Sequence, residues 1–327
     1  MSVYTSVSSA KLKQFLLQYD LGELLQFKGI TAGMENTNYF LDTTKGHYVL
    51  TLYEAYSVEE LPFFLGLMQH LSTHQVETTT PVIDKQGQLL NQLCGKPTAI
   101  IERLSGAALV QSDVTIEHCR LMGDALARFH LAGESYQHYR ENERESDFSE
   151  AFTTSLRATL NKQDQQLFQQ ELDFQQTIDW TALPSGITHS DLFCDNSMFD
   201  YIENKIVLSG IIDLYFSCHD AYIYDLAVVA NDWCFSANQG VNSLDEARWM
   251  ALLSAYNKVR KLQQTEKKAW TAMLRISALR FWMLRLNVTL NPRDGEMVLR
   301  KDPNEFKDKL IACLRDQKAI ERAMLSL

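Results

Sequence analysis

The sequence lacks several features that mark membrane, secreted and nucleic-acid-binding proteins. Its 327 residues contain no uncharged apolar run of about 18 residues, which excludes a predicted transmembrane helix. The N-terminal stretch also lacks the continuous apolar core of a secretory signal. The formal net charge is −10 and the pI is about 5.3, which argues against general affinity for nucleic acid or anionic membranes. We therefore expect neither a membrane nor a nucleic-acid partner.

Cysteine is present, but not in the patterns that would staple a fold or bind zinc. The six cysteines are scattered and none belongs to a C-x-x-C pair. Free thiols of this kind are typical of a reduced compartment, so we expect the protein to be cytoplasmic.

The chain shows no internal repeat or low-complexity block, and its apolar patterns divide it into two parts. Residues 26–54 and 82–104 have the short apolar runs and turns of an antiparallel sheet, with helices at 5–20 and 57–75. Helical spacing dominates afterwards, at residues 115–132, 138–179 (two helices), 222–235, 244–262 and 266–288. These patterns predict an α+β, bilobal protein with a β-rich N-terminal lobe (1–104) and a helical C-terminal lobe (105–327).

The most specific motif is His189-x-Asp191-x-x-x-x-Asn196, followed after a strand-like run by Ile211-Ile212-Asp213. This spacing is that of a kinase catalytic loop and its metal-binding aspartate. In such a loop Asp191 would accept the proton of the acceptor hydroxyl, and His189 would orient the loop. A polar turn between two helices is the alternative interpretation of the same residues.

Asn196 and Asp213 are the predicted ligands of Mg²⁺. Magnesium prefers hard oxygen donors and keeps several waters, so one amide oxygen, one carboxylate and the ATP phosphates fit that preference. The motif thus predicts phosphoryl transfer from ATP, with both Mg²⁺ and ATP in the cleft between the lobes.

With these residues in place, the chain resembles the aminoglycoside phosphotransferase and choline kinase superfamily, which has a protein-kinase-like fold. Within it, the chain is similar over nearly its full length to the bacterial homoserine kinases of the second type. The segments that carry the resemblance are residues 48–54, 61–68, 123–130, 189–196 and 277–282. The resemblance implies transfer of the ATP γ-phosphate to the side-chain hydroxyl of L-homoserine, which gives O-phospho-L-homoserine, a precursor of threonine.

The resemblance also implies nucleotide contacts in the N-terminal lobe. Gly33, Asn36 and Asn38 stand where a glycine-rich phosphate loop is expected, and Glu102 and Leu104 lie on the hinge that contacts the adenine. The usual phosphate-binding lysine is missing, because Thr51 occupies its position. Either Lys28 or Lys45 is a candidate replacement.

Homoserine requires one partner for its carboxylate and one for its ammonium group. Arg280 and Arg285, on an otherwise apolar helix, are candidates for the carboxylate; the alternative is that each points outward or bridges helices. The candidates for the ammonium group are Asp220, Asn231 and Asp232.

Three further questions remain open at the level of sequence. Asp225 resembles a superfamily aspartate that braces the catalytic loop, but it is equally explained as a helix N-cap. The acceptor could also be choline, methylthioribose or an aminoglycoside. The absent lysine at Thr51 leaves a catalytically inactive nucleotide-binding protein as the alternative from another class, although Asp191, Asn196 and Asp213 argue against it.

Overall fold

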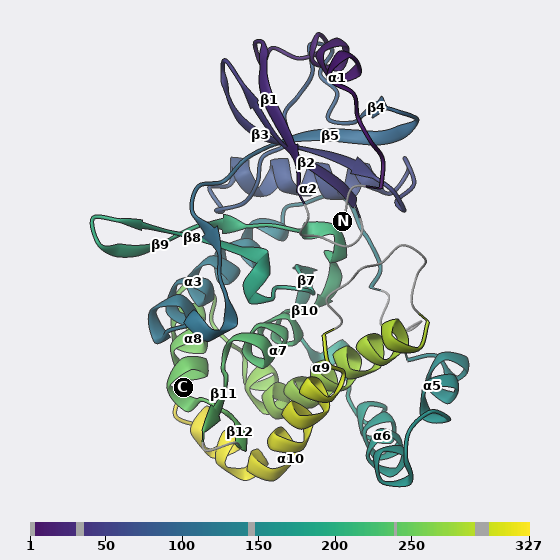
Figure 1. Cartoon of the computed structure of the whole chain (residues 1–327). Coiled ribbons are helices and arrows are strands. Elements are labelled where there is room, and N and C mark those ends of the chain that lie inside the picture. Colours follow the sequence, from purple (N-terminus) through teal and green to yellow (C-terminus); the bar gives the residue numbers. More distant parts are fainter. Residues whose placement is uncertain (1–3, 31–35, 143–147, 239–240, 292–300) are drawn as a thin grey trace. The chain divides into compact units, whose positions relative to one another are not determined.

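The computed structural model describes residues 4–30, 36–142, 148–238, 241–291 and 301–327 (Figure 1). These residues form two compact units, one containing the described residues up to Ser105 and the other those from Gly106 onward. No helix among the described residues is long and apolar enough to span a membrane.

The N-terminal unit is built on a five-stranded antiparallel sheet with the order β1-β2-β3-β5-β4. Its strands are β1 (Leu24–Gly29), β2 (Asn36–Thr43), β3 (Gly46–Tyr53), β4 (Asn91–Leu93) and β5 (Lys96–Glu102). Helix α1 (Ser9–Leu16) precedes the sheet and α2 (Leu61–Thr73) connects β3 to β4, with Pro62 in its first turn.

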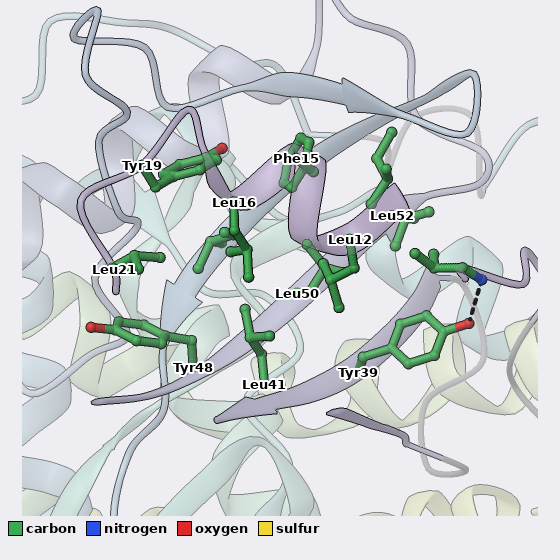
Figure 2. Close-up of a cluster of buried hydrophobic side chains, with 13 residues drawn as sticks. Leu12, Phe15, Leu16, Tyr19, Leu21, Tyr39, Leu41, Tyr48, Leu50 and Leu52 are labelled. Carbon is green, nitrogen blue, oxygen red and sulfur yellow. Dashed lines mark hydrogen bonds between the residues drawn. The ribbon is translucent and has the colours of Figure 1, made fainter. Parts of the chain in front are cut away.

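One face of this sheet is covered by α1 through a continuous apolar cluster (Figure 2). Leu12, Phe15 and Leu16 of the helix meet alternate residues of β2 and β3, among them Leu41 and Leu50. The hydroxyl of Tyr39 also accepts a hydrogen bond from the Val7 amide at 3.2 Å, which is the dashed line in Figure 2. Because side chains alternate across a strand, the neighbours of Leu41 in β2 and of Leu50 in β3 point to the face of the sheet that α1 does not cover.

The opposite face of the sheet carries polar residues that the sequence connected with nucleotide binding. Asn38 and Thr51 are direct partners in the β2–β3 register, and the Thr51 hydroxyl donates to Asn38 Oδ1 at 2.8 Å. Lys28 is paired with Phe40 on this same face. Thus the strand register, rather than any buried charge, places these side chains.

The C-terminal unit is mainly helical, with four short strand pairings inserted between the helices. Its helices are α3 (Ile116–Gly133), α5 (Glu150–Arg157), α6 (Lys162–Gln175), α7 (Tyr222–Trp233), α8 (Glu246–Val259), α9 (Gln264–Leu290) and α10 (Asn304–Met324). α3 packs closely on α8, where a Cβ on Gly123 would lie 2.1 Å from the Leu252 carbonyl oxygen. Every residue of α7 is buried, which makes this helix the centre of the unit.

The strands of the C-terminal unit flank the predicted catalytic motif. β7 (Ser185–Thr188) pairs with β10 (Cys218–Ala221), and β8 (Ser197–Ile202) pairs with both β9 (Lys205–Ile211) and β6 (Ala107–Ala108). A further hairpin joins β11 (Phe235–Asn238) to β12 (Val241–Leu244). The motif therefore runs from the end of β7 to the start of β8, and Asp213 follows β9.

The predicted α+β fold, with an antiparallel N-terminal sheet and a helical C-terminal part, is confirmed. The helices expected at 57–75, 115–132, 222–235, 244–262 and 266–288 all form, with ends that differ by a few residues. The sheet predicted at 82–104 begins later than expected, because its first apolar run, Pro81-Val82-Ile83, forms only an isolated bridge from Pro81 to Ile101 in place of a strand. α10 and the β7–β10 and β11–β12 pairs were not predicted.

Candidate active site

The predicted catalytic loop, residues 189–196, leaves β7 and closes in a short 3-10 helix at Cys194–Asn196. The Asn196 carbonyl accepts a hydrogen bond from the Ile212 amide at 3.0 Å, and Ser197 pairs with Ile211 across the β8–β9 hairpin. The hairpin therefore brings Asn196 next to the segment that holds Asp213.

His189 is fully buried and connects the two segments. Its Nε2 lies 2.9 Å from the Ile212 carbonyl, and its Nδ1 accepts the Asp191 amide at 3.3 Å. Burial lowers the pKa of His189 and so favours the neutral ring. Since a carbonyl can only accept, Nε2 carries the proton. This arrangement orients the loop and leaves the ring no proton to exchange with a substrate.

Helix α7 supports the back of the loop through the carboxylate of Asp225. Oδ2 accepts the His189 amide and Oδ1 accepts the Ser190 amide, both at 2.8 Å. The N-cap of α7 is Ala221, so the N-cap interpretation of Asp225 does not hold. Burial on its own would raise the pKa of Asp225, but the hydrogen bond and charge of His130, together with the His189 contacts, outweigh it and lower the pKa.

The end of α7 holds the second half of the loop. Asp232 Oδ2 accepts the Cys194 amide at 2.8 Å, and the Trp233 indole donates to the Leu192 carbonyl at 3.1 Å. Asp232, a sequence candidate for the substrate ammonium, is therefore engaged with the backbone of the loop. One rigid helix thus fixes four backbone groups of the loop.

Behind Asp225 lies a buried chain of two more polar side chains. His130, at the end of α3, has Nε2 3.0 Å from Asp225 Oδ2 and Nδ1 2.6 Å from the hydroxyl of Tyr256 on α8. Both are fully buried, and His130 stacks on Tyr222. Burial lowers the pKa of His130, so the neutral ring donates from Nε2 to Asp225 and accepts the Tyr256 proton at Nδ1. Neither His130 nor Tyr256 was among the site residues predicted from the sequence.

The front of the loop has a different character. The side chain of Asn196 donates from Nδ2 to the Asp191 carbonyl at 2.8 Å and to Asp191 Oδ2 at 3.3 Å. This contact sets the Asp191 carboxylate beside Asn196. Burial, followed by the nearby charges of Asp213 and Asp195, raises the pKa of Asp191 well above its ordinary value, while Lys301 and Arg280 oppose the shift.

Two residues of the site have left-handed backbone conformations. Ser190 has φ of 67° and Asp213 has φ and ψ of 63° and 56°. Non-glycine residues adopt this region uncommonly, and such strain persists where surrounding contacts impose it. At Ser190 the constraint comes from Asp225, whose carboxylate accepts the backbone amides of both His189 and Ser190.

The donor set fits a hard cation such as Mg²⁺. Because Asn196 Nδ2 is used by Asp191, the amide presents Oδ1, which has no hydrogen-bond partner among the described residues. Asp213 supplies a carboxylate whose charge already acts on Asp191. A divalent cation would offset this crowding of negative charge, and oxygen donors of these two types are those it prefers.

Besides Asp232, the four other predicted substrate residues do not share one environment. Arg280 is 7% exposed, donates to the Tyr224 hydroxyl at 3.4 Å, and has a charge that reaches Asp191. Arg285 instead pairs with Glu305 at 2.5 Å and stacks on Phe306, which ties α9 to α10. This geometry favours the helix-bridging alternative for Arg285.

The other two predicted substrate residues make contacts within the fold. Asn231 donates to the Leu274 carbonyl at 2.8 Å and to Ser277 Oγ at 2.6 Å, so its amide nitrogen serves α7–α9 packing. Asp220, on β10, is 4% exposed and accepts the Ala221 amide at 2.6 Å. The substrate roles of both stay predictions.

The predicted nucleotide residues lie in the N-terminal unit, except that Gly33 falls outside the described residues. Asn36 is 6% exposed, and its Oδ1 is buried with no hydrogen-bond partner among the described residues. Glu102 and Leu104 lie at and just after the end of β5. Of the two candidate lysines, Lys45 is paired with Asp20, at 2.5 Å, whereas Lys28 is exposed on the face of Asn38 and Thr51.

Comparisons with known proteins identify the family of the chain. The model of the phosphotransferase enzyme family matches residues 26–275. The homoserine kinase of Methylobacillus flagellatus is 42% identical over 307 residues, covering 94% of this chain and 93% of that protein. The homoserine kinase of Paraburkholderia xenovorans is 40% identical over 315 residues, covering 94% of each.

Solved structures support the fold alone, because their identity to this chain is low. An amicoumacin kinase in complex with AMP-PNP and Ca²⁺ has a TM-score of 0.67 and 17% identity, over 97% of this chain and 94% of that one. A spectinomycin phosphotransferase in complex with ADP and spectinomycin has a TM-score of 0.68 and 13% identity, over 99% and 100%. The fold is therefore the one shared by these protein-kinase-like enzymes. From the match of sequence over nearly its whole length, the chain belongs to the phosphotransferase enzyme family and, within it, to the family of the homoserine kinases.

Proposed function

We propose that this protein transfers the γ-phosphate of ATP to the side-chain hydroxyl of L-homoserine and releases ADP and O-phospho-L-homoserine, in the synthesis of threonine. The observation that supports this reaction type is the contact between Asp191 and Asn196, on a loop that α7 holds in place. The charge of Asp213, which follows β9, acts on the same Asp191 carboxylate. The substrate assignment is supported by the full-length similarity to homoserine kinases.

In this proposal Asp191 is the base of the reaction. The raised pKa makes this carboxylate more basic than an ordinary aspartate, which suits a group that takes up a proton. The homoserine oxygen forms a bond to the γ-phosphorus while the bond from that phosphorus to the bridging oxygen of ADP breaks, and the hydroxyl proton passes to Asp191. His189 keeps the loop in position.

Asn196 and Asp213 would hold Mg²⁺ through Oδ1 and a carboxylate oxygen. The bound cation would supply neutralisation of the charge on the phosphates. The residues of the chain then have three tasks, which are to align the acceptor, to accept its proton and to keep the loop rigid. Asn36, Asn38, Glu102 and Leu104 are proposed to contact the nucleotide.

The proposal also places the reaction in the cytoplasm, because all six cysteines are free. Choline, methylthioribose and aminoglycosides are the competing acceptors. No contact of the described residues favours one of them, so they enter as outcomes of the experiment.

The experiment is a coupled assay of ADP release with ATP, Mg²⁺ and a panel of acceptors: L-homoserine, L-serine, L-threonine, choline, methylthioribose and kanamycin. We expect turnover with L-homoserine, and a loss of about 10² to 10⁴-fold in the Asp191→Ala variant, the usual effect of removing a general base. Turnover with another acceptor alone would refute the substrate. Turnover that survives in a folded Asp191→Ala variant would refute the role of Asp191.

A further inference from the structure

An ion pair that the reaction scheme does not use lies on the catalytic loop. Lys301 Nζ is 3.1 Å from Asp195 Oδ2, although the two residues are 106 positions apart in the chain. Lys301 Nζ also lies 5.3 Å from the centre of the Phe193 ring. Asp195 immediately precedes Asn196 and is four residues from Asp191. The pair therefore places one negative and one positive charge beside the proposed base.

The scaffold of the loop does not need this pair. The amides of Cys194 and Asn196, on either side of Asp195, are held by Asp232 and by the Phe193 carbonyl. The side chains of Asp195 and Lys301 are 60% and 47% exposed. An exposed pair of this kind contributes only about 0–1 kcal/mol to stability and is screened by salt. A ligand can therefore separate the two side chains at little cost.

The chemistry of the pair is complementary to the backbone end of an amino acid. A free α-amino acid carries an ammonium and a carboxylate on the same carbon atom. If the ammonium binds Asp195 and the carboxylate binds Lys301, both side chains give up their mutual ion pair and each gains an oppositely charged group of the ligand. Because Asp195 raises and Lys301 lowers the pKa of Asp191, the balance of charge around the base is preserved on binding.

The dimensions of homoserine suit this arrangement. Its hydroxyl oxygen is separated from its ammonium nitrogen by four bonds, or about 5 Å. With a hydrogen bond of about 2.8 Å at each end, homoserine can therefore join an Asp191 oxygen to an Asp195 oxygen that lies up to about 10 Å away. The loop is compact, since the Phe193 amide donates to the Asp191 carbonyl at 2.8 Å and residues 194–196 form a 3-10 turn. Asp191 and Asp195 are four positions apart, which limits their Cα separation to about 13–14 Å even in an extended chain, and the turn at residues 191–193 shortens it.

We propose that Asp195 and Lys301 form the subsite for the amino-acid end of the acceptor, with Asp195 binding the ammonium and Lys301 the carboxylate. This subsite rests on the proposed function and adds to it the residues that select an α-amino acid over other alcohols. It also assigns the carboxylate to Lys301 in place of Arg280, which is buried against Tyr224.

The test is a cycle of protein variants against truncated acceptors. 3-Aminopropan-1-ol is homoserine without its carboxylate, and 4-hydroxybutanoate is homoserine without its ammonium. We expect Lys301→Met to lower kcat/KM for L-homoserine about 10- to 100-fold and to leave kcat/KM for 3-aminopropan-1-ol unchanged. Asp195→Asn should lower the homoserine value by a similar factor and leave the value for 4-hydroxybutanoate unchanged.

The matched control is Lys307→Met, which breaks an ion pair of the same length, 3.1 Å, between α10 and Asp164 of α6. It should leave all acceptors unaffected. Equal losses on every acceptor, or a raised KM for ATP in Lys301→Met, would overturn the subsite in favour of a general or phosphate-binding role.

Two other results have distinct meanings. Unchanged homoserine kinetics in Lys301→Met would also overturn the subsite and return the carboxylate to Arg280. A wild-type protein inactive on L-homoserine would refute the proposed function itself, and the subsite with it. The wild-type measurement therefore separates the failure of the function from the failure of the subsite.

Discussion

The two sides of the proposed catalytic loop shift the pKa of an aspartate in opposite directions. At the back, Asp225 accepts two backbone amides and the His130 side chain, and its pKa is lowered. At the front, burial and then the charges of Asp213 and Asp195 raise the pKa of Asp191. The loop is the same and the residue type is the same, so the difference arises from the surrounding groups.

This contrast separates architecture from chemistry. A carboxylate surrounded by donors is satisfied by the protein and holds other groups in place. A carboxylate that lacks enough donors is destabilised in its charged form, and a proton or a cation relieves that cost. The front of the loop is therefore the side that a substrate and a metal ion would complete, while the back keeps its shape without them.

The largest effect is expected at the back. Asp225→Ala leaves the His189 and Ser190 amides and the His130 ring without their acceptor, so the free energy of unfolding should fall by about 3–5 kcal/mol. Urea denaturation measures this loss. Arg120→Ala, which breaks an exposed ion pair with Glu117 on α3, should change stability by no more than about 1 kcal/mol. Equal effects of the two substitutions would remove the distinction between the sides.

The opposite sign is expected at the front. Asp191→Asn removes a negative charge from a crowded group, so stability at neutral pH should rise by about 0.5–2 kcal/mol while activity is lost. Thermal unfolding without Mg²⁺ measures the gain. Adding Mg²⁺ to the wild type should reduce the difference, because a cation offsets the same repulsion. A variant less stable than the wild type at neutral pH would contradict the interpretation of the front.

The pH dependence of this gain has a definite sign. The folded-state pKa of Asp191 lies above its ordinary value of about 3.9, so its contribution to stability is present below that pH and is lost as the pH rises through the folded pKa. Asp225 has the reverse dependence, with a contribution that is lost as the pH falls through its lowered folded pKa. The advantage of Asp191→Asn should therefore vanish in acid and grow with pH. A gain that is constant with pH would exclude ionisation of Asp191 as its cause.

The smallest effect sharpens the description of the back. Tyr256→Phe removes only the hydroxyl that donates to His130, which should cost about 1 kcal/mol of stability. A comparable loss of alignment would lower kcat about fivefold with little change in KM for either substrate. Tyr222→Phe is the matched control, because its ring stacks on His130 but its hydroxyl makes no hydrogen bond to that ring. Similar kcat values in the two variants would limit the role of Tyr256 to packing.

The fold class and the location of the site were accessible from sequence because both rest on local patterns. Apolar periodicity predicted α3, α7, α8 and α9, and the spacing from His189 to Asn196 located the loop. α10 was missed, although its apolar residues pack on α9 through Phe306 and Phe281. The β7–β10 pair was also missed because its strands are only four residues long and 30 positions apart.

The surroundings of the site were less accessible. A lone histidine at the end of an amphipathic helix gives no sign that its ring will lie against Asp225, which is 95 positions away. For the same reason the ammonium candidate Asp232 proved to hold a backbone amide of the loop, and Arg285 proved to bridge two helices. Residue type and spacing specify which groups are polar, but they do not specify which partners these groups meet.

The sequence by itself therefore determined the fold class and the family and predicted the residues of the proposed catalytic motif, because each depends on short-range order along the chain. Tertiary structure decided which aspartates are saturated with donors and which are crowded by like charge. It also decided that Lys301 stands beside Asp195. These outcomes depend on long-range contacts, since the pKa and the bonding of a side chain follow from the groups that folding brings around it.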